Sequence, residues 1–317
     1  MRICKAIWGI LLCLGFVLAG RGEAVDTELK GVMFADYYIV RGNGEEENGF
    51  RFRRIYLTHD LKWSDAFSGR VRLEARDAGF NSDQKIEPFV KHAYLRYRKD
   101  RHTIYMGLSS TLTWNVSESV WGYRSVEKTI MDRKKIASSA DIGIAYYTRL
   151  DEDGKVNARL MLANGSGQSS EADKYKKVYG LLHFEPGPLN LTAYVDWEKR
   201  PDNRGRTTFA TFIGLKKKNF HGGLEGFVQW RNHSAQVRGL SLFGAGQISE
   251  KIKVFARSDF FDPDDKSGDD GEYWFLGGLD IEPVKDIHIM PNVMGTNFQA
   301  SDVDIEVIPR MTLYVKF

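Results

Sequence analysis

Cysteine is nearly absent from this chain of 317 residues, which contains only Cys4 and Cys13. Both lie in the first 24 residues, where a basic start, an apolar run over residues 6–20 and a polar break follow one another as in a secretory signal peptide. The run is shorter than the roughly 18 residues of a membrane helix, although an uncleaved anchor is the alternative. We expect residues 1–24 to be removed, so the mature chain, residues 25–317, can use neither disulfides nor thiolate chemistry.

Long apolar runs and charge of one sign are also missing from the rest of the chain. No later segment is apolar for long enough to form a membrane helix. The 45 basic and 42 acidic residues nearly cancel, which gives no reason to expect a nucleic-acid partner. Hydrophobic residues make up 42% of the chain, too many for a disordered protein. The 8 prolines, 31 glycines and 13% aromatic residues favour strands joined by tight turns.

Strict alternation of apolar and polar residues is present instead. In residues 189–197 the apolar side chains occupy every second position, and the terminal stretch 303–317 repeats the pattern. A period of two residues predicts β-strands. The polar positions are rich in Arg, Lys, Asp and Glu, and the strands are about ten residues or longer, with aromatic residues near their ends.

These features predict an all-β protein, a closed transmembrane antiparallel β-barrel with lipid outside and water inside. A soluble β-sandwich also alternates and is the alternative fold. The expected sixteen strands are 31–40, 50–61, 67–76, 88–98, 102–108, 140–150, 155–164, 175–185, 189–199, 207–217, 220–231, 237–248, 251–261, 271–282, 286–294 and 302–317. They leave no room for a second domain.

Short polar turns alternate with longer connections along the predicted barrel, as at residues 41–48 and 262–271. Residues 109–139 are the longest unpatterned stretch and form the third external loop. Left outside the barrel, this loop would expose a cluster of apolar side chains, so we expect it to fold into the lumen. The cluster comprises Leu112, Trp114, Val116, Val120, Trp121, Tyr123, Ile130 and Met131.

The whole mature chain, ending in Leu313–Phe317, resembles Gram-negative outer-membrane porins. The stretches Phe89–Tyr97, Trp121–Lys128 and Ser138–Gly143 are similar to members of the phosphate-selective porin O/P family. The resemblance implies passive diffusion of small hydrophilic solutes, a homotrimer among outer-membrane lipids, and a terminal Phe317 recognised by the barrel-assembly machinery. It also implies an outer-membrane location in a Gram-negative bacterium.

Charges that face the lumen decide what a pore admits. Basic side chains opposite the apolar face of the second to fourth strands are the candidate pore-lining residues: Arg54, Arg70, Arg72, Arg76, His92, Arg96 and Arg98. In the second strand, the alternation before Arg53 and the alternation after it are out of step, so the sides of the wall assigned to Arg51 and Arg54 conflict. A bulge near Arg53 would reconcile them.

The third loop supplies the candidate constriction residues: Glu118, Arg124, Lys128, Asp132, Arg133, Lys134 and Lys135. Basic residues outnumber acidic ones both in this loop and on the wall beside it, which predicts a mild preference for anions, phosphate-like ones among them. The alternative is that these charges pair across strands and confer no selectivity.

Other functions have weaker support from the residues. A barrel hydrolase with a Ser/His pair at its rim, and a plugged barrel serving as adhesin or surface scaffold, are the competing hypotheses. The seven histidines show no metal-binding spacing, and the acidic stretch 262–272 departs from the EF-hand pattern. We therefore expect no catalysis, no metal and no cofactor.

Overall fold

The computed structural model describes residues 25–42, 45–77, 85–300 and 305–317, and the side chains of residues 42, 45 and 46 are not described. The predicted signal peptide, residues 1–24, lies outside these ranges. Within them, no helix has the length and apolar character needed to span a membrane.

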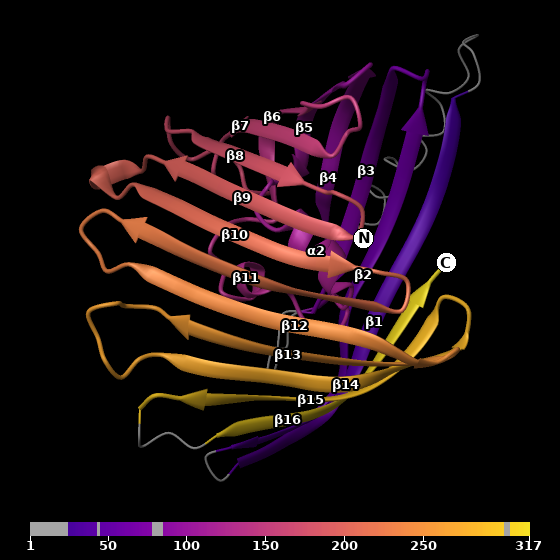
Figure 1. Cartoon of the computed structure of the whole chain (residues 1–317), viewed down its shortest axis with the longest axis vertical. Helices are drawn as coiled ribbons and strands as arrows, with labels where there is room; N and C mark the ends of the chain where they lie inside the picture. Colours follow the sequence, from indigo (N-terminus) through magenta and orange to yellow (C-terminus); the bar gives the residue numbers. More distant parts are fainter. Residues whose placement is uncertain (1–24, 43–44, 78–84, 301–304) are drawn as a thin grey trace, which may run out of the picture.

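Sixteen antiparallel strands form one closed barrel, in which each strand pairs with its neighbours in sequence and β1 pairs with β16 (Figure 1). The predicted closed antiparallel barrel of sixteen strands is therefore confirmed. The strands are β1 Asp26–Gly42, β2 Glu45–Lys62, β3 Phe67–Arg76, β4 Glu87–Lys99, β5 His102–Ser110, β6 Ala140–Arg149, β7 Val156–Ala163, β8 Lys177–Phe184, β9 Leu189–Glu198, β10 Arg206–Lys216, β11 Phe220–Arg231, β12 Val237–Ser249, β13 Ile252–Asp262, β14 Glu272–Val284, β15 Ile287–Phe298 and β16 Glu306–Lys316.

The predicted loop at residues 41–48 is wrong. The ladder between β1 and β2 continues through the pairs Ile39–Asn48 and Val40–Glu47 as far as Gly42. Backbone groups pair regardless of side-chain polarity, so a run of polar residues does not by itself end a strand.

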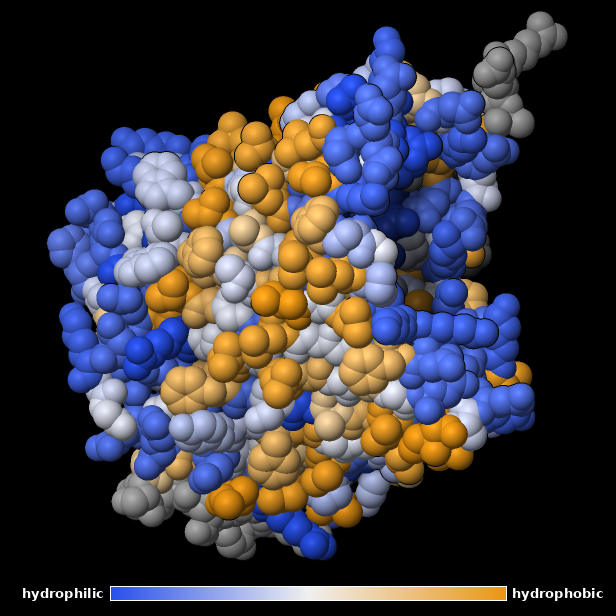
Figure 2. Space-filling model, in the orientation of Figure 1, coloured by the Kyte–Doolittle hydropathy of each residue, from blue (hydrophilic) through white to orange (hydrophobic). Residues whose placement is uncertain are grey.

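Alternate side chains of each strand point to opposite sides of the wall. In β10, Phe209 and Ile213 are 43% and 55% exposed, whereas Ala210 and Phe212 are 5% and 2% exposed. The exposed apolar residues form a band across the outer face, and hydrophilic residues gather at both ends of the strands (Figure 2). Exposed Trp197 lies near a strand end, in the position that an aromatic girdle occupies.

The two ends of the barrel differ in their connections. At the short-turn rim, neighbouring strands are joined by residues 63–66, 100–101, 150–155, 185–188, 217–219, 250–251 and 285–286. Apart from the β1–β2 hairpin, the long-loop rim has the connections 77–86, 111–139, 164–176, 199–205, 232–236, 263–271 and 299–305. β1 begins and β16 ends at the short-turn rim.

The last residue completes the seam between β1 and β16. The Gly31 amide donates to the Phe317 carbonyl oxygen at 2.6 Å, and the Phe317 amide donates to the Gly31 carbonyl oxygen at 2.9 Å. The seam therefore continues to the end of the chain.

A register shift confirms the predicted bulge near Arg53. Phe34 pairs with Arg54 while Asp36 pairs with Arg51, so two residues of β2 lie opposite one residue of β1. The bulge places two consecutive arginines on the inner side of the wall: Arg53 contacts Asp36 and Arg54 contacts Glu74.

Gly107 in β5 provides a test of the wall's local geometry. Its φ is +117°, and a Cβ atom there would lie 2.4 Å from the Ala93 carbonyl oxygen. We expect Gly107→Ala to lower the free energy of unfolding by about 1 kcal/mol or more, measured by urea titration in detergent. The matched control is Gly277→Ala, because a Cβ atom at Gly277 meets nothing within 4 Å. Equal stabilities of the two variants would contradict this reading of β5.

Candidate functional site

Residues 111–139 pack against side chains of β10–β14 that point away from the exposed apolar band, and Figure 1 shows α2 (Asn115–Trp121) within the ring of strands. The eight apolar side chains that were predicted to pack away from water are at most 8% exposed. The Trp121 ring lies 5.2 Å from Phe243 and 6.3 Å from Phe255, both nearly fully buried. At the end of α2, Gly122 takes a left-handed conformation and donates its amide to Glu118, which turns the chain towards β1 and β2.

Three arginines from distant strands hold one short stretch of this loop backbone. Arg53 of β2 donates to the carbonyl oxygens of Ser125 and Val126 at 2.9 and 2.8 Å. Arg310 of β16 donates to the Val126 carbonyl oxygen at 2.7 Å, and Arg257 of β13 donates to that of Lys128. We call these three side chains the arginine clamp. Charge-assisted hydrogen bonds of this kind are stronger than neutral ones, so the clamp fixes residues 125–128 across the barrel.

Most of the candidate constriction charges are already paired. Arg124 contacts Glu118 at 3.0 Å and Asp132 at 3.2 Å, and Lys128 lies 3.9 Å from Asp132. Arg133 reaches Asp259 and Glu272, Lys134 also contacts Glu272, and Lys135 is exposed.

Glu127 is the acidic group of the clamped stretch. Burial alone would raise the pKa of its carboxyl group, but the positive charges of Arg53 and Arg310 outweigh burial and lower the pKa to about 2. Glu127 therefore stays ionised at neutral pH and offsets part of the clamp's charge.

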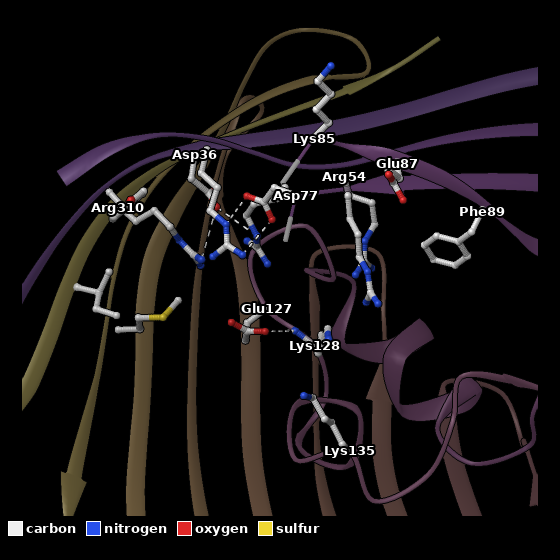
Figure 3. Close-up of a pocket in the computed structure, with 16 residues that line it drawn as sticks. Asp36, Arg54, Asp77, Lys85, Glu87, Phe89, Glu127, Lys128, Lys135 and Arg310 are labelled. Carbon is white, nitrogen blue, oxygen red and sulfur yellow. Dashed lines mark hydrogen bonds and ion pairs between the residues drawn. The ribbon is translucent and has the colours of Figure 1, made fainter. Parts of the chain in front are cut away.

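A cavity of about 1060 Å³ lies on one side of the clamped stretch. Figure 3 shows Asp36, Asp77 and Arg310 grouped at one of its walls, with Glu127, Lys128 and Lys135 of the loop facing them. The arginines that line this cavity are largely neutralised.

Four of the five arginines have a carboxylate partner, whereas Arg76 has none among the described residues. Arg51 donates to Asp77 at 3.0 Å, Arg54 contacts Glu74 at 3.0 Å, and Asp36 lies 3.2 Å from Arg53 and 3.7 Å from Arg310. The basic wall next to this cavity therefore follows the alternative in which charges pair across strands.

Arginines nearer the short-turn rim behave differently. Within the described parts of the chain, Arg72, Arg96, Arg98 and Arg159 have no carboxylate within 4.0 Å. Arg72 donates to the Thr58 hydroxyl and Arg96 to the Ser68 hydroxyl, both at 2.8 Å. We call these four the unpaired arginines.

The remaining predicted wall residues are held by specific neighbours. Arg70 is paired with Asp60 at 2.6 Å, and the Arg76 guanidinium lies 5.4 Å from the centre of the Phe89 ring. Sequence reasoning did not select Arg53, although the parity conflict pointed to the bulge that directs it. It also left out Arg159, whose side chain points to the inner side of the wall, as that of His183 on the next strand does.

A serine–histidine contact bears on the hydrolase hypothesis. His92 is 5% exposed and its Nε2 lies 3.1 Å from the Ser110 hydroxyl oxygen, but its Nδ1 has no hydrogen-bond partner among the described residues. A catalytic triad needs a third group that orients the base. The described residues also include no group of three His, Cys, Asp or Glu side chains that could hold a metal ion.

Comparisons with known proteins show which solved structures share this fold. No protein-family model matches the chain, and no curated protein matches it in sequence. Among solved structures, the chain is similar to an anion-selective porin from Comamonas acidovorans, with 13% identity, a TM-score of 0.67, and coverage of 92% of this chain and 100% of the other.

Two further structures share the architecture. The outer membrane channel DcaP of Acinetobacter baumannii has 13% identity and a TM-score of 0.71, over 94% of this chain and 99% of that one. OmpF of Salmonella typhi, solved with daunomycin, has 10% identity and a TM-score of 0.70, over 92% and 97%. The chain therefore has the fold of the sixteen-stranded porins.

The arginine clamp can be tested through its effect on stability. Replacing Arg53, whose side chain is 12% exposed, with Met removes the donors to two loop carbonyls and a partner of buried Asp36. We expect Arg53→Met to lower the free energy of unfolding by about 3 kcal/mol and to make residues 111–139 accessible to protease. Arg98→Met, at an unpaired and exposed arginine, is the control. Identical proteolysis of the two variants would show that Arg53 does not hold the loop.

Proposed function

We propose that this protein is a porin of the Gram-negative outer membrane, through which small hydrophilic solutes diffuse passively, with a mild preference for anions. The observation that carries the proposal is the set of unpaired arginines on the inner wall of a closed barrel whose outer face is apolar. The likeness to a structure described as an anion-selective porin supports it. Phosphate-like solutes fit the guanidinium groups as bidentate partners.

The anion preference rests on an imbalance of charge within the lumen. Near the clamped loop, carboxylates offset part of the charge of the arginines, and basic side chains still outnumber acidic ones around the cavity. Near the short-turn rim, the unpaired arginines leave positive charge that water and mobile anions must compensate. Confined charges are screened less than charges on an open surface, so we expect the unpaired arginines to add to the preference for anions.

Residues 111–139 form the constriction loop in this proposal. Their two helices, α2 and α3 (Ile130–Arg133), occupy the β10–β14 side, which directs solutes along the wall of β2–β7. We further propose that the protein is made with a signal peptide, residues 1–24, assembles as a homotrimer, and is recognised by the barrel-assembly machinery through Phe317.

Charge reversal at two unpaired arginines tests the selectivity. In planar bilayers under a KCl gradient, we expect Arg72→Glu/Arg96→Glu to move the reversal potential towards cations, with a several-fold change in the permeability ratio that grows as the salt is diluted. The control reverses two exposed basic residues of the long-loop rim, Lys174→Glu/Arg204→Glu. If both double variants change the selectivity equally, the selectivity is not set by the arginines of the inner wall.

Shortening the loop tests the constriction. We expect a variant in which residues 115–133 are replaced by a short Gly/Ser linker to show a higher single-channel conductance and a weaker ion selectivity, because the wall opposite β2–β7 is removed. Bilayer recording of single channels measures both. Unchanged conductance in a correctly folded variant would mean that the loop does not set the bore.

A further inference from the structure

Three tyrosines on neighbouring strands line the inner wall near the unpaired arginines: Tyr94 of β4, Tyr105 of β5 and Tyr147 of β6. Their ring centres are 5.3 Å apart between Tyr94 and Tyr105, and 4.9 Å apart between Tyr105 and Tyr147. The rings therefore form one contiguous aromatic cluster that crosses three strands, with interplanar angles of 76° and 49°.

Each of these tyrosines has an arginine as its direct cross-strand neighbour. The register pairs Arg70 with Tyr94, Arg96 with Tyr105, and Arg159 with Tyr147. The Arg159 guanidinium lies 5.1 Å from the centre of the Tyr147 ring. We call these six residues the tyrosine–arginine track.

The hydroxyl groups of the three tyrosines are not used by the fold. Across the described ranges none of them makes a hydrogen bond to the protein, and all three side chains are half-buried, with part of their surface in the lumen. Elsewhere on the inner wall, Tyr179 and Tyr194 are 1% exposed and donate to Asp141 and Asp196 at 2.7 and 2.5 Å. Those two tyrosines serve the structure, whereas the tyrosines of the track offer their rings and hydroxyls to the lumen.

Two cavities adjoin the track. One of about 330 Å³ is lined by Arg70, Tyr94 and Arg96, together with the acidic residues Asp26, Glu28 and Asp60. The other, of about 480 Å³, is lined by Tyr147 and four arginines with one acidic residue, Asp100, and is the better suited to an anion. Each is large enough for a monosaccharide-sized group. An inorganic anion would use the guanidinium groups but would gain nothing from the aromatic surface.

We propose that the tyrosine–arginine track binds acidic sugars, uronic acids and their short oligomers, as they pass through the pore. The carboxylate accepts hydrogen bonds from a guanidinium, the apolar face of the sugar ring packs on a tyrosine ring, and the sugar hydroxyls pair with the free phenol groups. The Arg70 guanidinium is occupied by Asp60, so Arg96 and Arg159 are the cationic partners, and three tyrosines on adjacent strands between them suit a chain of repeated acidic units. This inference rests on the proposed porin function and names a solute class for it.

Tri-galacturonate is the ligand with which to test the track, with acetate, glucose and benzoate for comparison. We expect tri-galacturonate to interrupt single-channel current, and to bind the purified protein in detergent by calorimetry, at concentrations where the other three do neither. Tyr105→Leu should weaken both effects about tenfold because the stacking surface is lost. Tyr105→Phe, which keeps the ring and removes the hydroxyl, should weaken them about fivefold.

The matched control is Tyr146→Leu, since Tyr146 is the next residue to Tyr147 but belongs to the exposed outer face. Equal block by acetate, stronger block by benzoate, or full binding by Tyr105→Leu would overturn the proposal. Calorimetry tests binding to the track independently of conduction through the pore. If the protein forms conducting channels but does not bind tri-galacturonate, the porin function stands and the proposed binding to the track is wrong. Binding without channels, lost in Tyr105→Leu, would support the track and count against the porin.

Discussion

The closed ladder of backbone hydrogen bonds is the constraint on which the rest of the structure depends. Strands that cross lipid must satisfy every backbone donor and acceptor within the protein, and a barrel does this without leaving an edge. The seam between β1 and β16 extends to Gly31 and Phe317, so closure uses the last residue of the chain. Closure also assigns each strand one outer and one inner face, and it thereby decides which charges share the interior.

Pairing among those interior charges divides the lumen into two parts. Carboxylates from neighbouring segments reach Arg51, Arg53 and Arg54, and the arginine clamp, which includes Arg53, holds the loop backbone. Arg72 and Arg96 have only hydroxyl partners among the described residues. The same residue type is therefore held by carboxylates and loop carbonyl groups in one part of the wall and by hydroxyl groups in the other.

Alternation was sufficient to predict the number of strands, their order and even the bulge at Arg53, because a period of two residues reports directly on which side of the wall a residue lies. It could not predict pairing. Arg54 meets Glu74 because of the register between strands, and Arg53 meets Ser125 across 72 positions of sequence. The loop predicted at residues 41–48 was also wrong, since polar residues such as Asn48 pair through their backbone.

The central claim is that the unpaired arginines make a closed barrel into an anion-preferring pore. The most direct test is the zero-current potential of the unmodified protein in a planar bilayer with a tenfold KCl gradient. We predict discrete channels whose potential has the sign of chloride selectivity and grows as both solutions are diluted. Channels with the sign of potassium selectivity, or membranes that show no channels with folded protein, would contradict the account.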